Sequence, residues 1–238
     1  MGIDGRVVVI TGATGGLGRV VARSFAERGA RLALVSGDQA KLDAQAQELG
    51  LPAERVLVHA ADLRDPAAVS GAARAVTEQF GGADVLLHLV GGWVGGKPIA
   101  ETDPSDLASM LDQHVWTTFH LLRAFVPILV ARGWGRIVVV SATGTSRPAA
   151  KMGAYAAAKA AEEMLIQTVA REMAGQGVTA NVLQARAIDV EHKRDSEPSA
   201  TNASWTTPEE IAAAMLYLCS EEAGPVSGER LSLAGAEL

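Results

Sequence analysis

Short apolar segments alternate along this chain with longer segments whose apolar residues recur at helical spacing. The short segments are rich in Val, Ile and Leu and end at glycine or polar residues, as buried parallel strands do. They predict strands at Arg6–Thr11, Arg31–Ser36, Arg55–Ala60, Ala83–Val90, Arg136–Val140, Val178–Leu183 and Arg230–Leu233. The longer segments predict helices at Gly16–Arg28, Gln39–Leu49, Pro66–Phe80, Pro104–Arg132, Met152–Ala174 and Pro208–Ser220. Pro127 lies inside the fourth of these helices, where we expect a kink or an end.

Strand and helix alternate over the whole chain, which predicts an α/β fold. We expect a doubly wound parallel sheet of about seven strands with helices on both faces. Because no repeat or linker interrupts the pattern, we expect residues 1–238 to form a single domain. Residues 191–206 are polar and lack periodicity, so we expect a substrate loop or lid within that domain.

Composition excludes several classes of protein. Of the 238 residues, 48% are hydrophobic and 20% are charged, which argues against a disordered chain. The lone Cys219 excludes an intrachain disulfide and a cysteine-based zinc site, and we expect no metal. A formal net charge of -6 offers no basic surface to nucleic acid. We find no signal-peptide pattern and no apolar stretch approaching a bilayer span, and therefore expect a cytoplasmic protein without a membrane partner.

A glycine-rich segment, TGATGGLG, joins the first predicted strand to the first predicted helix. Glycines there permit a tight turn and let backbone N–H groups approach a pyrophosphate, which a helix N-terminus also attracts. The alternative is an ordinary strand–helix turn. Its place at the first strand and first helix of an alternating chain favours nucleotide binding.

Tyr155 and Lys159 are four residues apart in a predicted helix and therefore share one of its faces. A phenol has a pKa near 10. A neighbouring ammonium favours the phenolate, so we expect Lys159 to lower the pKa of Tyr155. Tyr155 would then donate a proton in a reduction or accept one in an oxidation. The alternative is a core tyrosine beside an exposed lysine.

These motifs, together with Asp62 after the third strand, resemble the short-chain dehydrogenase/reductase family over essentially the whole chain. The resemblance implies a Rossmann fold, a nicotinamide cofactor (NAD or NADP), and redox chemistry on a carbonyl, imine or alcohol. It implies that Lys159 also binds the cofactor ribose and that Asp62 and Leu63 contact the adenine, although Asp62 could be a turn or cap residue. The cofactor-binding candidates are Gly12, Thr14, Gly15, Gly16, Leu17, Gly18, Ser36, Gly37, Asp62, Leu63, Val90, Gly91, Gly92, Tyr155 and Lys159. A homodimer or homotetramer built through the two long helices is also implied.

The choice between NAD and NADP stays open at the end of the second strand. An acidic residue there binds the ribose hydroxyls of NAD, and a basic residue pairs with the 2′-phosphate of NADP. Asp38 favours NAD, but it suits the N-cap of the next helix equally well. The nearest cations are Arg19 and Lys41.

Two catalytic residues that are usual in the family, a serine and an asparagine, are replaced in this sequence. The family's serine, thirteen residues before the tyrosine, is Ala142 here, and the neighbouring Ser141 should face the other side of its strand. The family's asparagine aligns with His114, which is either a structural residue bridged to Lys159 by water or a second acid–base group. We expect His88, at the end of a strand, to be a packed polar residue.

Several short motifs together resemble the dihydropteridine reductase branch of the family. They are Gly91–Gly96, Trp116–Thr118, Ala142 in the serine position, Met152–Tyr155 and Ser204–Thr206. That branch keeps the tyrosine and lysine without the serine and reduces a quinonoid pterin. A reactive quinonoid imine needs less polarisation than a ketone, so one proton source and a hydride donor suffice.

We therefore expect an NAD(P)H-dependent reductase of a planar small molecule that carries a carbonyl or a quinonoid imine. The candidate catalytic residues are Tyr155, Lys159, His114 and Ser141, and the candidate substrate-binding residues are Trp93, Ala142, Thr143, Arg186 and Trp205. Trp93 and Trp205 lie where flat aromatic walls would suit a planar ring. The alternative is a non-redox enzyme, such as a cyclase, isomerase or dehydratase, because the nicotinamide side departs from the family at Leu89, Val90, Ala185, Arg186 and Val190.

Overall fold

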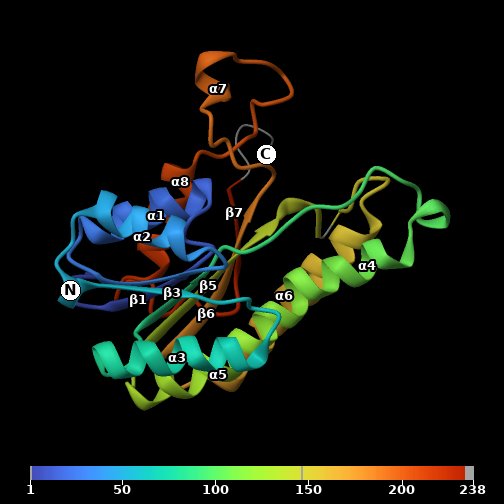
Figure 1. Ribbon diagram of the computed structural model, residues 1–238. Helices are drawn as coiled ribbons and strands as arrows, with labels where there is room; N and C mark the ends of the chain where they lie inside the picture. Colours follow the sequence, from blue (N-terminus) through green and yellow to red (C-terminus); the bar gives the residue numbers. More distant parts are fainter. Residues whose placement is uncertain (1, 146, 234–238) are drawn as a thin grey trace.

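A computed structural model describes residues 2–145 and 147–233. Its sheet holds seven parallel strands in the order β3-β2-β1-β4-β5-β6-β7 (Figure 1). The strands are β1 (Val7–Thr11), β2 (Arg31–Ser36), β3 (Val56–Ala60), β4 (Val85–His88), β5 (Gly135–Ala142), β6 (Val178–Ala185) and β7 (Arg230–Ser232). The longer helices are α1 (Gly16–Ala26), α2 (Gln39–Leu49), α3 (Pro66–Phe80), α5 (Thr117–Ala131), α6 (Gly153–Glu172) and α8 (Pro208–Leu218). The predicted Rossmann-type fold is confirmed.

The strand order places a switch point between β1 and β4. The chain first builds β1, β2 and β3 outward and then returns to add β4 on the other side of β1. In this register Thr11 pairs with Val35 on one side and with His88 on the other. In open parallel sheets a ligand crevice forms at such a point, beyond the carboxyl ends of the strands.

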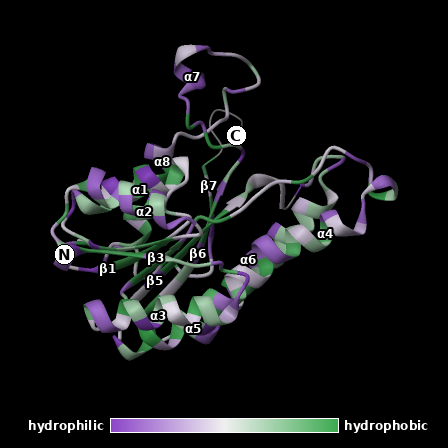
Figure 2. Cartoon of the chain, in the orientation of Figure 1, coloured by the Kyte–Doolittle hydropathy of each residue, from purple (hydrophilic) through white to green (hydrophobic). Residues whose placement is uncertain are grey.

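Alternating side chains of the strands feed two apolar cores, one on each face of the sheet. Val7 and Val9 of β1 pack with Phe125 of α5, whereas Val8 and Ile10 pack with Phe25 of α1. Helices α3, α5 and α6 therefore cover one face, and α1, α2 and α8 cover the other (Figure 1). The central strands β1 and β4 are hydrophobic and buried on both faces, whereas the edge strand β7 is exposed (Figure 2).

The helical segment Pro104–Ala131 is continuous and differs from expectation in two ways. It runs on through Pro127, so the helix does not end there. It also contains a π-helical turn, η3 (Leu111–Trp116), between α4 (Pro104–Met110) and α5. Its length and composition would allow it to cross a membrane, contrary to the expectation from the sequence that no segment would. However, four of its large side chains, Leu121, Leu122, Phe125 and Leu129, are buried in the core beneath the sheet, so we describe it as a core helix.

Residues 191–206 connect β6 to α8 and include a short helix, α7 (Lys193–Ser196), where we expected only a loop. This segment is mostly hydrophilic and projects away from the sheet (Figures 1 and 2). Backbone N–H groups of Lys193 and Arg194 both donate to the carboxylate of Asp189, each at 2.8 Å. The N-cap residue His192 makes no side-chain cap, so Asp189 satisfies the first N–H groups of α7 in a segment without apolar periodicity.

Candidate functional site

The glycine-rich loop closes tightly between β1 and α1. Gly12 has φ of +70°, in the left-handed region that favours glycine. A Cβ on Gly18 would lie 2.3 Å from the carbonyl oxygen of Gly12, so only glycine fits there. The N-cap residue Gly15 supplies no side-chain cap, and the first turn of α1 holds no acidic residue. The N–H groups of that turn are therefore left for an external anion.

A first cavity, of about 730 Å³, lies beside this loop at the ends of β2, β3 and β4. Its wall includes Gly12, Gly15, Ser36, Gly37, Ala60, Ala61, Asp62, Leu63, Arg64, Leu89, Val90, Gly91, Gln113 and Thr117. Ser36 is held there by a 2.7 Å hydrogen bond between its Oγ and Oγ1 of Thr14. Hydrogen bonds from Arg64 lower the pKa of Asp62 to about 2. The structure thus brings Asp62 and Leu63, the candidates for adenine contact, together with the cofactor-binding candidates Ser36 and Gly37.

Asp38 lies at the start of α2 and acts as its N-cap. Its carboxylate accepts a 3.1 Å hydrogen bond from the backbone of Lys41 and pairs with the Lys41 ammonium at 3.3 Å. Arg19 pairs with Glu48 at 3.1 Å. Since Asp38 is not on the wall of the first cavity, the structure supports the capping interpretation of this residue.

A second cavity, of about 440 Å³, adjoins the first and shares five wall residues with it: Gly12, Gly15, Leu89, Val90 and Gly91. It also contains the predicted residues Gly16, Leu17, Gly18, Gly92, Trp93, His114, Ser141, Tyr155, Lys159 and Arg186. Ala142, Thr143 and Trp205 are not on its wall. Trp205 instead belongs to the α7 segment, where its carbonyl accepts a 2.8 Å hydrogen bond from Arg194. The aromatic wall predicted for a planar ring is therefore Trp93 alone.

The ammonium of Lys159 is directed inward, toward the core. It donates to the carbonyl of Val140 at 2.8 Å and to Oε2 of Glu162 at 2.7 Å, and the residue is 4% exposed. Burial raises the pKa of Tyr155, and the negative charge of Glu162 raises it further. The expected lowering of the pKa of Tyr155 is therefore wrong for this structure, because the phenol is buried and the lysine is paired with the Glu162 carboxylate. The available signal was the spacing of Glu162, three residues after Lys159 on one helix face.

His114 is fully buried in the π-helical turn, with its ring edge-on to Tyr155 at 5.6 Å between centroids. Its Nε2 lies 2.9 Å from the carbonyl oxygen of Gly92. Because a carbonyl only accepts, Nε2 carries the proton and Nδ1 is an acceptor, which has no partner in the described part of the chain. Burial and the charge of Lys159 lower the pKa of His114 to about 4. The ring is therefore neutral near neutral pH, which favours the structural interpretation over an acid–base group.

Three other predicted polar residues have defined partners. His88 is buried, its Nδ1 lies 2.7 Å from Oγ1 of Thr11, and burial lowers its pKa to about 3. Ser141 donates to the buried carboxylate of Glu163 at 2.6 Å, so its hydroxyl proton is committed away from the cavity. Arg186 donates to Oγ of Ser204 at 2.6 Å and links the end of β6 to the segment before α8. In residues 2–145 and 147–233, no three His, Cys, Asp or Glu side chains are grouped to hold a metal ion.

The chain matches one protein family and resembles known dehydrogenases and reductases in sequence and in fold. Residues 6–200 match the family described as short chain dehydrogenase. The chain is 31% identical to 2,3-dihydroxy-2,3-dihydro-p-cumate dehydrogenase of Pseudomonas putida, over 98% of this chain and 94% of that protein. Its fold matches the 3-ketoacyl-(acyl-carrier-protein) reductase of Brucella melitensis complexed with NADH (TM-score 0.88, 27% identity, 98% of both chains). It equally matches the L-sorbose reductase of Gluconobacter frateurii complexed with NADPH and L-sorbose (TM-score 0.88, 29% identity, 100% of this chain and 98% of that one).

Proposed function

Since the chain belongs to the short chain dehydrogenase family, we propose that it is an NAD(P)H-dependent reductase with Tyr155 as its proton donor. The proposed substrate is a planar small molecule that carries a carbonyl or a quinonoid imine. One observation carries the proposal: Tyr155 and Lys159 line a cavity that adjoins the glycine-rich loop and the first cavity. A nucleotide cofactor and a proton donor can thus meet at one place.

The described residues fit a dinucleotide. The uncapped first turn of α1 would bind the pyrophosphate, since the turn offers free N–H groups and the glycines leave room for phosphate oxygens. The first cavity would hold the adenosine between Gly37, Asp62 and Leu63. The nicotinamide would lie in the second cavity, where it supplies the hydride when bound. Solved relatives contain NADH in one case and NADPH in another, so both cofactors belong in the test.

The environment of Tyr155 suits proton donation. Because burial and Glu162 raise its pKa, the phenol keeps its proton at neutral pH and can give it to the atom that is being reduced. Lys159 has three N–H donors, of which the carbonyl of Val140 and Glu162 occupy two. The third would bind a hydroxyl of the cofactor ribose and so orient the ring beside Tyr155.

The proposed substrate class rests on the lack of a serine hydroxyl at position 142. Ala142 stands where the family's serine is expected, and the hydroxyl of Ser141 is bound to Glu163. We propose that neither position 141 nor position 142 supplies a hydroxyl to polarise the substrate, which favours an electrophile as reactive as the quinonoid imine of the dihydropteridine reductase branch. Trp93, 58% exposed on the cavity wall, would stack on such a ring.

The decisive experiment combines binding with turnover. Purified protein is titrated with NADH and NADPH while nicotinamide fluorescence is followed, and oxidation is then assayed with quinonoid dihydropterins and carbonyl compounds. Tyr155→Phe should reduce turnover by roughly a thousandfold and leave the cofactor Kd nearly unchanged, because it removes only the proton donor. Unchanged turnover would remove Tyr155 from the mechanism, and failure of the wild-type protein to bind either cofactor would refute the reductase.

A non-redox enzyme is the second candidate, favoured by the crowding of the nicotinamide side. Arg186 is on the wall of the second cavity, and the side chain of Val190 lies against Gly16, 2.6 Å from where a Cβ would stand. Cofactor binding without oxidation on any compound of the panel would support this candidate.

A further inference from the structure

Two consecutive glutamates of α6, Glu162 and Glu163, are both fully buried. A buried carboxylate is costly unless charged or polar partners surround it. Glu163 accepts from Ser141 at 2.6 Å, from Gln184 at 2.9 Å and from Arg230 at 2.6 Å. These partners lie on β5, β6 and β7, so Glu163 fastens α6 to the edge of the sheet.

Glu162 has a different set of partners, all of them next to the candidate active site. Its Oε2 accepts from the Lys159 ammonium at 2.7 Å, and its Oε1 accepts from the Thr118 hydroxyl at 3.0 Å. Nε2 of His88 lies 3.8 Å from the same Oε1. Lys159 is the candidate group that would bind the cofactor, so Glu162 is one contact away from the chemistry. Glu162 is buried between α5, α6 and β4, so a substrate molecule cannot reach its carboxylate.

We propose that Glu162 is a positioning residue of the reductase: its carboxylate holds the Lys159 ammonium inward and so sets the charge beside Tyr155. This role rests on the proposed function of Tyr155 and Lys159. Glu162 touches neither the substrate nor the cofactor; it acts through the charge that it places behind these two side chains. A hydrophobic side chain at position 162 would fill the same space but would leave the ammonium of Lys159 buried without its carboxylate.

The charges around this site favour such a role. From α6 itself, Lys159, Glu163 and Tyr155 are close, while His88 approaches from β4 and His114 from the π-helical turn. Both histidines have lowered pKa values, so they are neutral near neutral pH. Burial is the first cause of the raised pKa of Tyr155, and the negative charge of Glu162 adds to it. Burial also raises the pKa of Glu162 itself, against the opposing effects of the Lys159 ammonium and the Thr118 hydroxyl.

The test measures the pKa of Tyr155 directly, without cofactor or substrate. The chain has two tyrosines, and Tyr217 is exposed on α8. In a Tyr217→Phe background, the ultraviolet absorbance of tyrosinate reports Tyr155 alone. Glu162→Gln keeps the shape of the side chain and removes its charge, so the pKa of Tyr155 should fall by on the order of one unit. The matched control is Glu163→Gln, which makes the same change at an equally buried neighbour and should leave this pKa in place.

Turnover supplies the second readout. With Glu162→Gln, the loss of reductase activity at alkaline pH should begin at lower pH by a similar amount, because Tyr155 gives up its proton earlier. The KM of the cofactor should also rise, because Lys159 is no longer held. A merely structural Glu162 would reduce stability and leave both the pKa of Tyr155 and the alkaline limb unchanged, and that result would overturn the inference.

A backup variant covers the case in which Glu162→Gln does not fold. Thr118→Val removes the hydroxyl that stabilises the Glu162 carboxylate and should shift the pKa of Tyr155 in the same direction by a smaller amount. An unshifted Tyr155 in this variant would overturn the inference. If the wild-type protein binds no cofactor, the proposed function fails, whereas the spectroscopic titration still decides the electrostatic role of Glu162.

Discussion

At the scale of single residues, the buried polar groups set how this protein responds to acid. His88 and His114 have pKa values lowered to about 3 and about 4, in both cases mainly by burial. An unfolded histidine titrates near 6.5. Below that pH the histidines of the unfolded chain bind protons, whereas those of the folded chain stay neutral. The stability that each histidine contributes is therefore complete above about pH 6.5 and is lost as the pH falls toward the pKa of that histidine in the folded protein.

We predict a matching loss of stability in mild acid. Between about pH 6.5 and pH 4, the free energy of unfolding should fall by up to roughly 1.4 kcal/mol per pH unit for each of the two histidines. Urea denaturation at a series of pH values measures this slope. His88→Asn keeps a hydrogen-bonding side chain but cannot bind the proton, so its slope should be shallower. An equal slope in the variant and the wild type would show that His88 is not responsible.

The sequence was sufficient to predict some residues of the candidate site, and physical reasons explain why the others were missed. The spacing of Tyr155 and Lys159 was sufficient to place both side chains on one cavity. The role of Glu162 was not predictable, because a glutamate on a helix is usually solvated and only the packing of α5 on α6 shows that this one is buried. Asp38 was ambiguous because capping and ribose binding require the same carboxylate at the same position.

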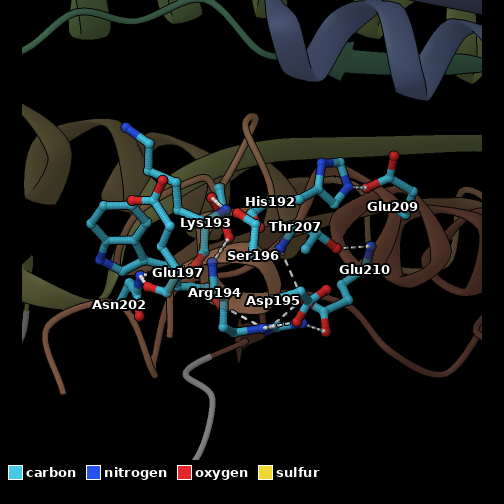
Figure 3. Close-up of polar contacts among 12 residues, drawn as sticks. His192, Lys193, Arg194, Asp195, Ser196, Glu197, Asn202, Thr207, Glu209 and Glu210 are labelled. Atoms are coloured by element: carbon cyan, nitrogen blue, oxygen red, sulfur yellow. Dashed lines mark hydrogen bonds and ion pairs between the residues drawn. The ribbon is translucent and has the colours of Figure 1, made fainter. Parts of the chain in front are cut away.

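At the scale of elements, the segment before α8 is held by a small set of charged contacts. Arg194 donates to both carboxylate oxygens of Glu210, at 3.0 and 2.7 Å, and to the carbonyl of Trp205. His192 pairs with Glu209 at 3.0 Å (Figure 3). A bidentate arginine pair that also binds the backbone fixes a segment better than a single exposed ion pair does.

We predict that Arg194 controls the opening of this segment. Arg194→Gln should increase the rate of amide hydrogen exchange between residues 188 and 206 while leaving the exchange of the sheet unchanged, because it removes the bidentate pair with Glu210 and the bond to the Trp205 carbonyl. Lys193→Gln is the matched control, since among the described residues the one ion pair of the Lys193 ammonium is with the exposed Glu191 of the same segment, at 2.7 Å. Equal exchange rates in the two variants would contradict this assignment.

The sequence predicted every strand and every long helix to within two residues at each end. Strong apolar periodicity and clear stop signals account for this accuracy. The π-helical turn was missed because a single widened turn changes the register of a helix without changing its composition. That turn carries His114 to the second cavity, so the error fell on an element that shapes the site.

At the scale of the whole molecule, we propose a single domain over residues 1–238 that assembles as a homodimer or homotetramer. A groove of about 310 Å³ runs between α5 and α6. Exposed apolar side chains lie on the same two helices and at the end of the preceding π-helical turn: Phe119 of α5 is 37% exposed, Met164 of α6 57% and Trp116 of η3 50%. Such a surface is typical of a helix–helix interface between subunits.

We predict that a charge on this surface separates the subunits. Phe119→Glu combined with Met164→Glu should lower the molar mass measured by light scattering to that of a smaller assembly or a monomer, because burying two carboxylates is unfavourable. Ile99→Glu is the control, since Ile99 is 77% exposed on the loop before α4 and away from this groove. A variant that keeps the wild-type mass would place the interface elsewhere.

The switch point between β1 and β4 also sets the order in which the site can form during synthesis. All residues on the wall of the first cavity lie between positions 12 and 117, whereas the second cavity draws on residues as late as Val190. The amino-terminal half of the chain therefore contains every residue on the wall of the first cavity before β5, β6 and β7 are translated. Tyr155, Lys159 and Arg186 of the second cavity are translated later, so the wall of the first cavity is complete in the growing chain before that of the second.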